Sequence, residues 1–291
     1  MAETVPVGRL LGPAQIRRLA RELEVNPTKK LGQNFVHDAG TVRRIAALEV
    51  GAGDEVIEIG PGLGSLTLAL LETGARVTAV EIDPRLAGAL KGTVQSHLPA
   101  AAGNLEIITE DALNLSAQQV QSPLALVANL PYNVSVPVLL HVLAEFPTIR
   151  RVVVMVQKEV AERLVAAPGS RTYGSPSVKL AWYGKARMGG AVGRKVFWPE
   201  PNVDSALVVM QAETPPGDPA LRAATFSLVD AAFSQRRKMI RASLREALGG
   251  EQATAEIMRV AGVDPTLRPE QLGVTDFVRL AQAELQLGEE R

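Results

Sequence analysis

Acidic and amide side chains stand just after three apolar, β-branched runs of the sequence. Glu81, Asp111 and Asn129 each come within three residues of the end of such a run. If these runs are parallel strands, their carboxyl ends meet at one edge of the sheet, where α/β proteins bind ligands. Carboxylate and amide oxygens accept hydrogen bonds from hydroxyl and amine groups. The sequence therefore predicts a site for a ligand that carries hydroxyls and an amine.

A glycine-rich turn precedes these residues. The segment Glu58-Ile59-Gly60-Pro61-Gly62-Leu63-Gly64 lies between a strand-like run and a helical pattern, a setting in which a ligand approaches the backbone closely. Its glycines run G-x-G-x-G, so they match the dinucleotide fingerprint only loosely. Glu81 follows where an acidic side chain accepts hydrogen bonds from both ribose hydroxyls. Because Asp111 is placed to accept from an adenine amine, the pattern predicts an adenosine-containing cofactor.

The segment Asn129-Leu130-Pro131-Tyr132 is suited to activating the exocyclic amine of a base. The N6 amine of adenine is a weak nucleophile because its lone pair is delocalised into the ring. The side-chain oxygen of Asn129 and a backbone carbonyl near Leu130 can accept both N–H bonds, which frees that lone pair. Pro131 stiffens the turn, and Tyr132 offers a ring on which a flipped base stacks. The alternative is a Pro-Tyr loop that fills a corner of the core.

The elements that must position these residues alternate between strands and helices. Strand-like runs cover residues 56–59, 77–80, 105–108, 124–127, 152–156, 186–192 and 206–211. Helical patterns between them cover residues 66–72, 84–93 and 136–146. This alternation indicates an α/β, Rossmann-like fold with seven strands, mostly parallel, and helices on both faces.

Three regions follow from the breaker residues of the chain. We expect an N-terminal extension over residues 1–28 and a catalytic domain over residues 29–213. The segment Thr214-Pro215-Pro216-Gly217-Asp218-Pro219 is a linker, because it is rich in breakers and no strand pattern follows it. A small all-helical C-terminal domain over residues 219–291 completes the prediction, with helices over 220–233, 237–248, 253–261 and 275–285.

Composition excludes several classes of protein. The chain has 291 residues, 46% of them hydrophobic and 21% charged, and no cysteine, which excludes disulfides, thiolate zinc sites and a cysteine nucleophile. No apolar run approaches the roughly 20 residues of a membrane helix, and the N-terminus lacks a signal-peptide pattern. We expect a cytoplasmic protein that does not bind membranes.

Basic residues gather locally although the net charge is zero. One cluster contains Arg236, Arg237, Lys238, Arg241 and Arg245, and a second contains Lys179, Lys185, Arg187, Arg194 and Lys195. A phosphate backbone responds to such local patches and not to the total charge. The first cluster predicts an RNA-binding stripe on one helix face, and the alternative is a solvated helix face.

Several motifs together resemble the ribosomal RNA adenine N6-dimethyltransferases, and in particular their bacterial small-subunit members. Beside the glycine turn, they are Lys29-Lys30-Leu31-Gly32-Gln33-Asn34-Phe35, Glu81-Ile82-Asp83, Asp111-Ala112, Asn129-Leu130-Pro131-Tyr132, Phe197-Trp198-Pro199-Glu200-Pro201-Asn202-Val203-Asp204-Ser205 and Phe233-Ser234-Gln235-Arg236-Arg237-Lys238. The resemblance runs from about residue 29 to residue 280. Val36 stands where the family usually has Leu, and Glu110 where it often has Gly, and neither change removes a polar contact.

The resemblance implies a class I methyltransferase sheet, S-adenosyl-L-methionine as the cofactor, and dimethylation of two adjacent adenines near the 3′ end of 16S rRNA in a small-subunit assembly intermediate. It implies that cofactor contacts come from Asn34, Val36, Gly60, Gly62, Glu81, Ile82, Asp111, Ala112 and Asn129. Asn129 would also hold the target amine, and Phe197 would face Tyr132 across the flipped base. In-line methyl transfer requires no metal, and we expect a monomer.

Three alternatives remain open. The enzymes that methylate 23S rRNA share the cofactor and target-base motifs, but the tail, with Leu267-Arg268-Pro269-Glu270-Gln271-Leu272, resembles the small-subunit enzyme. A non-catalytic ribosome-assembly factor could keep the fold, although the intact Asn129 segment and Glu81 argue against it. DNA adenine methyltransferases resemble Asp-Pro-Pro-Tyr at this place and usually carry an inserted domain, for which no segment here is long enough.

Overall fold

A computed structural model of the chain describes residues 10–25 and 34–289. Their contacts group into two units. Unit 1 runs up to Ala161 and includes Arg187–Ala212, and unit 2 contains Glu162–Ala186 and the chain from Glu213 onward. Within the described ranges, no helix is long and apolar enough to cross a membrane. The motif residues 29–33 lie outside the described residues.

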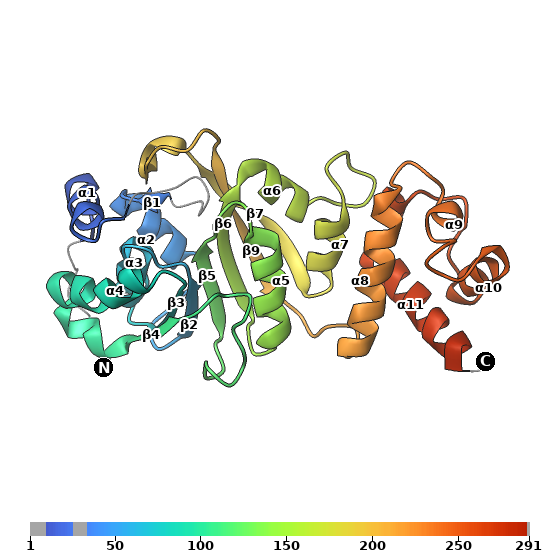
Figure 1. The fold of residues 1–291 in the computed structure, drawn as a ribbon, viewed down its shortest axis with the longest axis horizontal. Helices are drawn as coiled ribbons and strands as arrows, with labels where there is room; N and C mark the ends of the chain where they lie inside the picture. The colour runs from blue at the N-terminus through green and yellow to red at the C-terminus, as the bar shows by residue number, and fades with distance from the viewer. Residues whose placement is uncertain (1–9, 26–33, 290–291) are drawn as a thin grey trace. The chain divides into compact units, whose positions relative to one another are not determined.

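A seven-stranded sheet organises the fold (Figure 1). Its strands are β2 (Glu55–Ile59), β3 (Arg76–Glu81), β4 (Leu105–Thr109), β5 (Ala125–Asn129), β6 (Arg151–Gln157), β7 (Gly184–Val192) and β9 (Ser205–Ala212), in the order β4-β3-β2-β5-β6-β9-β7. The first five are parallel, and β9 is antiparallel to β6. The predicted α/β fold, with its mostly parallel sheet of seven strands, is confirmed. Strand order reverses between β2 and β5, the switch point at which such sheets bind ligands.

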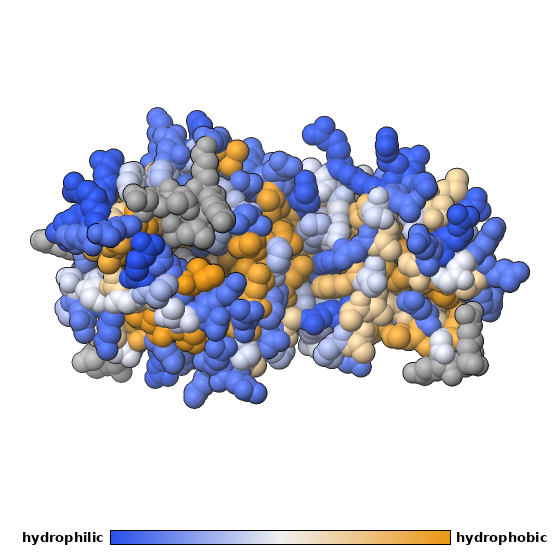
Figure 2. All heavy atoms as spheres, viewed as in Figure 1, coloured by the Kyte–Doolittle hydropathy of each residue, from blue (hydrophilic) through white to orange (hydrophobic). Residues whose placement is uncertain are grey.

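Helices join these strands. In unit 1 they are α1 (Pro13–Glu22), α2 (Ala39–Ala47), α3 (Ser65–Glu72), α4 (Pro84–His97), α5 (Ser135–Glu145) and most of α6 (Lys158–Leu164), with short 3₁₀ turns at Pro99–Asn104 and Arg194–Val196. Because helices cover both faces of a parallel sheet, its strands are continuously apolar, and β5 and β6 are buried almost throughout. Two buried acids interrupt this apolar pattern, Glu58 on β2 and Glu81 at the end of β3. Apolar atoms reach the surface in the region of α5 (Figure 2).

Two short strands form a second sheet that the sequence did not predict. Strands β1 (Phe35–Val36) and β8 (Phe197–Trp198) pair antiparallel, with Phe35 opposite Trp198 and Val36 opposite Phe197. The Phe35 and Trp198 rings stack with their centroids 6.5 Å apart. This pairing joins two motifs that are far apart in the sequence.

Unit 2 is helical. It contains α7 (Ser175–Ala181), α8 (Pro219–Ser234), α9 (Ile240–Ser243), α10 (Glu251–Ala261) and α11 (Val274–Glu289), with a 3₁₀ turn at Pro269–Gln271. The helices predicted over residues 220–233, 253–261 and 275–285 are confirmed. Contacts place residues 162–186 in this unit, whereas we expected them in the catalytic domain. The ion pair of Lys179 with Asp230 (2.7 Å) and the bond from the Tyr173 hydroxyl to the Leu272 carbonyl (2.9 Å) account for this grouping.

The helix predicted over residues 237–248 is wrong in extent, because α9 covers only Ile240–Ser243. Met239 is extended (φ −61°, ψ 147°). The backbone N–H of Ile240 donates to the Leu267 carbonyl (2.6 Å) and that of Arg241 to the Pro265 carbonyl (3.4 Å). These donors therefore bond to the loop before Pro269 and not to the preceding turn, so Arg237 does not share one continuous helix with Arg241.

Candidate active site

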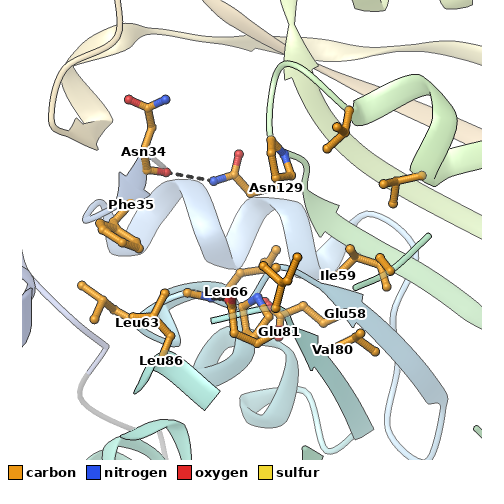
Figure 3. Close-up of a pocket in the computed structure, with 18 of the residues that line it drawn as sticks. Asn34, Phe35, Glu58, Ile59, Leu63, Leu66, Val80, Glu81, Leu86 and Asn129 are labelled. Carbon is orange, nitrogen blue, oxygen red and sulfur yellow. Dashed lines mark hydrogen bonds between the residues drawn. The ribbon is translucent and has the colours of Figure 1, made fainter. Parts of the chain in front are cut away.

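A cavity of about 240 Å³ lies at the carboxyl ends of β2, β3 and β5 (Figure 3). The predicted site residues that line it are Asn34, Val36, Gly60, Gly62, Glu81, Ile82, Asp111, Ala112, Asn129 and Pro131. Figure 3 shows Glu58 and Glu81 on one side of the cavity, and Asn34 and Asn129 on the other. The structure therefore brings the glycine turn, the strand-end acids and the amide into one place.

The glycine turn is tied to Glu81. The backbone N–H of Gly62 donates to Glu81 Oε2 and that of Asp83 to Oε1, both at 3.0 Å. Gly62 has φ +58°, and a Cβ there would stand 2.9 Å from the Phe35 ring, so glycine is required for both reasons. Burial raises the pKa of Glu81, while the two N–H donors lower it. This buried carboxylate can accept further hydrogen bonds from ligand hydroxyls, since each oxygen has a second lone pair.

Asp111, in the turn after β4, lies beside an apolar wall of the cavity. Asp111 Oδ1 accepts from the Leu113 backbone N–H at 2.9 Å, and the Asp111 N–H donates to Glu110 Oε1 at 2.8 Å. These bonds fix the turn after β4 and leave the other Asp111 oxygen to accept from a ligand amine. Ile82 lines the same cavity and is 57% exposed. A carboxylate at the edge of an apolar wall suits a flat ring that carries an amine.

Asn129 ends β5 and is held from across the cavity. Its side-chain Nδ2 donates to the backbone carbonyl of Asn34 at 3.0 Å (Figure 3). An amide that donates through its nitrogen presents its oxygen as an acceptor. The half-buried Asn129 therefore carries a fixed acceptor beside the cavity, as activation of an amine requires.

Three predicted residues do not line the cavity. Leu130 is buried, and its N–H donates to the Met155 carbonyl at 3.1 Å. The half-buried Tyr132 shares a hydrogen bond of 2.8 Å between its hydroxyl and Ser205 Oγ. Phe197, expected to face Tyr132, is only 3% exposed, because β8 pairs with β1 and its ring joins the core of unit 1.

Glu58 is a site residue to which sequence reasoning gave no role. It lines the cavity and is 1% exposed, and its Oε2 has no hydrogen-bond partner within residues 10–25 and 34–289. Burial, together with the nearby charge of Glu81 and against a smaller opposing effect of the Thr67 hydroxyl, raises the pKa of Glu58 to about 8. The available signal was an acid inside the otherwise apolar run of residues 56–59. The apolar lining, such as Phe35, Leu66 and Val138, has no comparable sequence signal.

In the structure, some residues of the two basic clusters pair with acids and others are exposed. Arg236 is occupied inside unit 2, because it donates to the Arg171 carbonyl at 2.9 Å and pairs with Glu270 at 3.6 Å. Exposed members are Arg237, Lys238, Arg241 and Arg245, and Arg241 and Arg245 line a second cavity of about 510 Å³. Residues of the second cluster pair with acids, for example Lys185 with Glu213.

Comparison with known proteins agrees with this geometry. A family model described as ribosomal RNA adenine dimethylase matches residues 25–284. The ribosomal RNA small subunit methyltransferase A of Thermobifida fusca is 57% identical over 94% of this chain and 96% of its own length. The protein of the same name from Leifsonia xyli is 58% identical over 94% of this chain and 98% of its own length.

Solved structures share the fold. A dimethyladenosine transferase from Plasmodium falciparum is similar with a TM-score of 0.74 and 23% identity, over 88% of this chain and 98% of the other. The 23S rRNA methyltransferase ErmE is similar with a TM-score of 0.62 and 27% identity, over 86% of this chain and 99% of the other. Because the family model spans nearly the whole described chain and relatives exceed half identity over most of their length, the chain belongs to the ribosomal RNA adenine dimethylase family, as its motifs predicted.

Proposed function

We propose that this chain uses S-adenosyl-L-methionine to dimethylate N6 of two adjacent adenines near the 3′ end of 16S rRNA, within a small-subunit assembly intermediate. The observation that carries the proposal is Asn129, whose amide is fixed by the Asn34 carbonyl beside the cavity that Glu81 and the glycine turn also line. Relatives named small subunit methyltransferases, at 57% and 58% identity, support 16S rRNA and not 23S rRNA as the target.

The residues of the cavity fit the cofactor. Glu81 would accept the ribose hydroxyls, and Asp111 would accept the adenine amine, with Ile82 and Ala112 flanking the ring. Asn34 and Val36 would line the methionine end, where Gly60 and Gly62 allow close approach. The bound cofactor contributes an electrophilic methyl group on a sulfonium. The chain then contributes alignment and exclusion of water, and this chemistry requires no metal.

The target adenine would be held at the end of β5. The Asn129 side-chain oxygen and the carbonyl near Leu130 accept the two N–H bonds of the amine, and Pro131 keeps their turn rigid. Tyr132 stacks on the flipped base, because Ser205 anchors its hydroxyl and leaves the ring as the contact surface. Phe197 supports the site from behind through its pairing with Val36.

Contacts to the RNA backbone would come from the exposed cations of unit 2. We assign this role to Arg237, Lys238, Arg241 and Arg245, whose exposure leaves them accessible to phosphates. Arg236 is left out because its guanidinium already contacts Arg171 and Glu270. We further propose that the chain acts as a monomer in the cytoplasm.

Labelled cofactor tests the assignment. The chain is incubated with methyl-labelled S-adenosylmethionine and either unmodified small subunits or unmodified large-subunit RNA, and the labelled base is mapped. Label on two adjacent adenines of 16S rRNA is expected. Label on 23S rRNA would instead assign the alternative function that ErmE carries, and no label on either RNA would favour a non-catalytic assembly role.

A further inference from the structure

The side chain of Glu58 places a carboxyl group in the middle of the sheet. It lies on β2, opposite Ala79 of β3 and Val127 of β5. Its side chain borders the cavity, yet no contact in the proposed reaction uses it. A buried ionised carboxylate is costly unless hydrogen bonds or opposite charge compensate it, so the position requires an explanation.

The groups facing Glu58 favour a neutral form in the free chain. Burial and the carboxylate of Glu81 on β3 raise the pKa of Glu58, and they outweigh the hydroxyl of Thr67 on α3, which lowers it. Glu81 accepts two backbone N–H bonds, which stabilise its charged form, whereas Glu58 Oε2 accepts none from the described residues. Of the two neighbouring acids, Glu58 is therefore the one that holds a proton at neutral pH.

We propose that Glu58 is the counter-ion of the cofactor: neutral in the free chain, it releases its proton to solvent when a cationic group of S-adenosylmethionine enters the cavity. This inference rests on the proposed function, which places that cofactor there. The carboxyl O–H bond breaks, the proton goes to the buffer, and the carboxylate remains beside the ligand cation. Favourable interaction with that cation offsets the cost of two buried anions side by side.

The charge of Glu58 also affects how tightly the chain binds the cofactor before and after methyl transfer. S-adenosylmethionine carries a sulfonium and an ammonium, whereas S-adenosylhomocysteine keeps only the ammonium. If the sulfonium is the partner of Glu58, its loss in the reaction returns a proton to Glu58 and weakens the hold on the product. If the ammonium is the partner, both ligands displace the proton equally.

Calorimetry in paired buffers tests the proposal. S-adenosylmethionine is titrated into the full chain at pH 7 in two buffers of different ionisation enthalpy, and the slope of observed enthalpy against ionisation enthalpy counts the protons released. With the pKa of Glu58 at about 8, wild type should release about 0.9 proton more than Glu58→Gln. The ligand's own amine contributes equally to both proteins and cancels. Affinity for the cofactor should fall about tenfold in the variant.

Glu110→Gln is the matched control, because Glu110 lines the same cavity but is half-exposed and accepts the Asp111 N–H, so its proton count should equal wild type. S-adenosylhomocysteine in a parallel titration identifies the cation. In wild type alone, the release should also shrink as pH rises above 8, which tests the proposal if Glu58→Gln does not fold. Cofactor binding with equal proton counts in wild type and Glu58→Gln, or with a release unchanged above pH 8, would overturn the inference. No cofactor binding by wild type would instead refute the proposed function.

Discussion

The side chain of Asn129 donates a 3.0 Å hydrogen bond to the backbone carbonyl of Asn34, a residue 95 positions earlier in the chain. The two residues come from different motifs, one at the end of β5 and the other just before β1. Since the nitrogen of the amide is held by this carbonyl, its oxygen is the atom left to contact a substrate. This hydrogen bond therefore links the residues that we propose for the cofactor to the residue that we propose for the target base.

Replacing Asn129 should uncouple chemistry from cofactor binding. Asn129→Ala should lower turnover by a factor on the order of 100 or more, because a preorganised acceptor of the amine is lost. S-adenosylmethionine affinity should stay near wild type, because the variant loses only the one hydrogen bond to the Asn34 carbonyl at the cofactor end of the cavity. Single-turnover methylation and calorimetry measure the two quantities. Asn114→Ala removes an exposed amide that does not line the cavity and should leave both unchanged. Full turnover by the Asn129 variant would refute the assigned mechanism.

Glu81→Ala should weaken cofactor binding and loosen the glycine turn together. The change removes the acceptors of the ribose hydroxyls and of the Gly62 and Asp83 N–H groups, and each lost charge-assisted bond costs roughly 1.5 to 3 kcal/mol. Asp83→Ala is the control. It removes the cap of α4, where Asp83 accepts the Arg85 N–H, so it should lower stability by about 1 kcal/mol without a comparable loss of affinity. Unchanged affinity in the Glu81 variant would separate Glu81 from the cofactor site.

Much of this site was predictable because strand ends are visible in a sequence. Apolar β-branched runs located the seven strands, and the polar residue after each run marked the edge where Glu81, Asp111 and Asn129 now meet. Family motifs added Asn34 and Val36, for which the spacing alone gave no reason.

What could not be predicted depends on contacts distant in the sequence. The β1 and β8 pairing buries Phe197, although the family resemblance implied a ring that faces Tyr132 across a flipped base. The helix expected over residues 237–248 is short because Ile240 bonds to Leu267, a loop that local helix patterns do not include. Glu58 is visible in the sequence, but only the assembled sheet shows that it is buried and that its Oε2 has no hydrogen-bond partner among residues 10–25 and 34–289.

The buried Glu58 should make stability fall with rising pH. Its pKa is about 8 in the folded chain against an ordinary 4.5, so the folded state binds the proton more tightly. The resulting stability is fully present below pH 4.5 and is lost as pH rises through 8. Glu58→Gln mimics the neutral form, so relative to wild type it should gain on the order of 3 to 5 kcal/mol between pH 5 and pH 9. Denaturant titrations at both pH values measure this difference, and parallel pH profiles would contradict the neutral assignment.

The hydrogen bond between Tyr132 and Ser205 should act on RNA through the position of the ring. Tyr132→Phe and Ser205→Ala each remove this 2.8 Å bond, so each should lower kcat/KM for the RNA several-fold, equivalent to about 1 kcal/mol. The double variant should be little worse than either single one, since both changes break the same contact. Cofactor affinity should not change. Additive losses would mean that the two hydroxyls act separately.

The exposed cations of unit 2 should govern the salt dependence of RNA binding. Replacing Arg237, Arg241 and Arg245 with Gln should weaken the binding of pre-ribosomal RNA and flatten the slope of log affinity against log salt by up to about 2 to 3 units, because phosphate contacts are lost. Cofactor affinity should remain that of wild type. Because α9 is short, Arg237 does not share a helix face with the other two arginines. Arg241 and Arg245 line one cavity and should contribute more, so the double variant of Arg241 and Arg245 should retain most of the effect.

A structural role for these arginines predicts a different result. They would then pair with acids such as Glu246 or Glu256 and hold unit 2 together, although Glu256 already pairs with Arg259 at 2.6 Å. Arg279→Gln is therefore the matched control, since its side chain is held by Asp276, three residues earlier, and does not line the cavity of Arg241 and Arg245. This control should change the salt slope less than Arg241→Gln or Arg245→Gln does. An unchanged slope with a lowered melting temperature in the triple variant would refute the RNA-binding assignment.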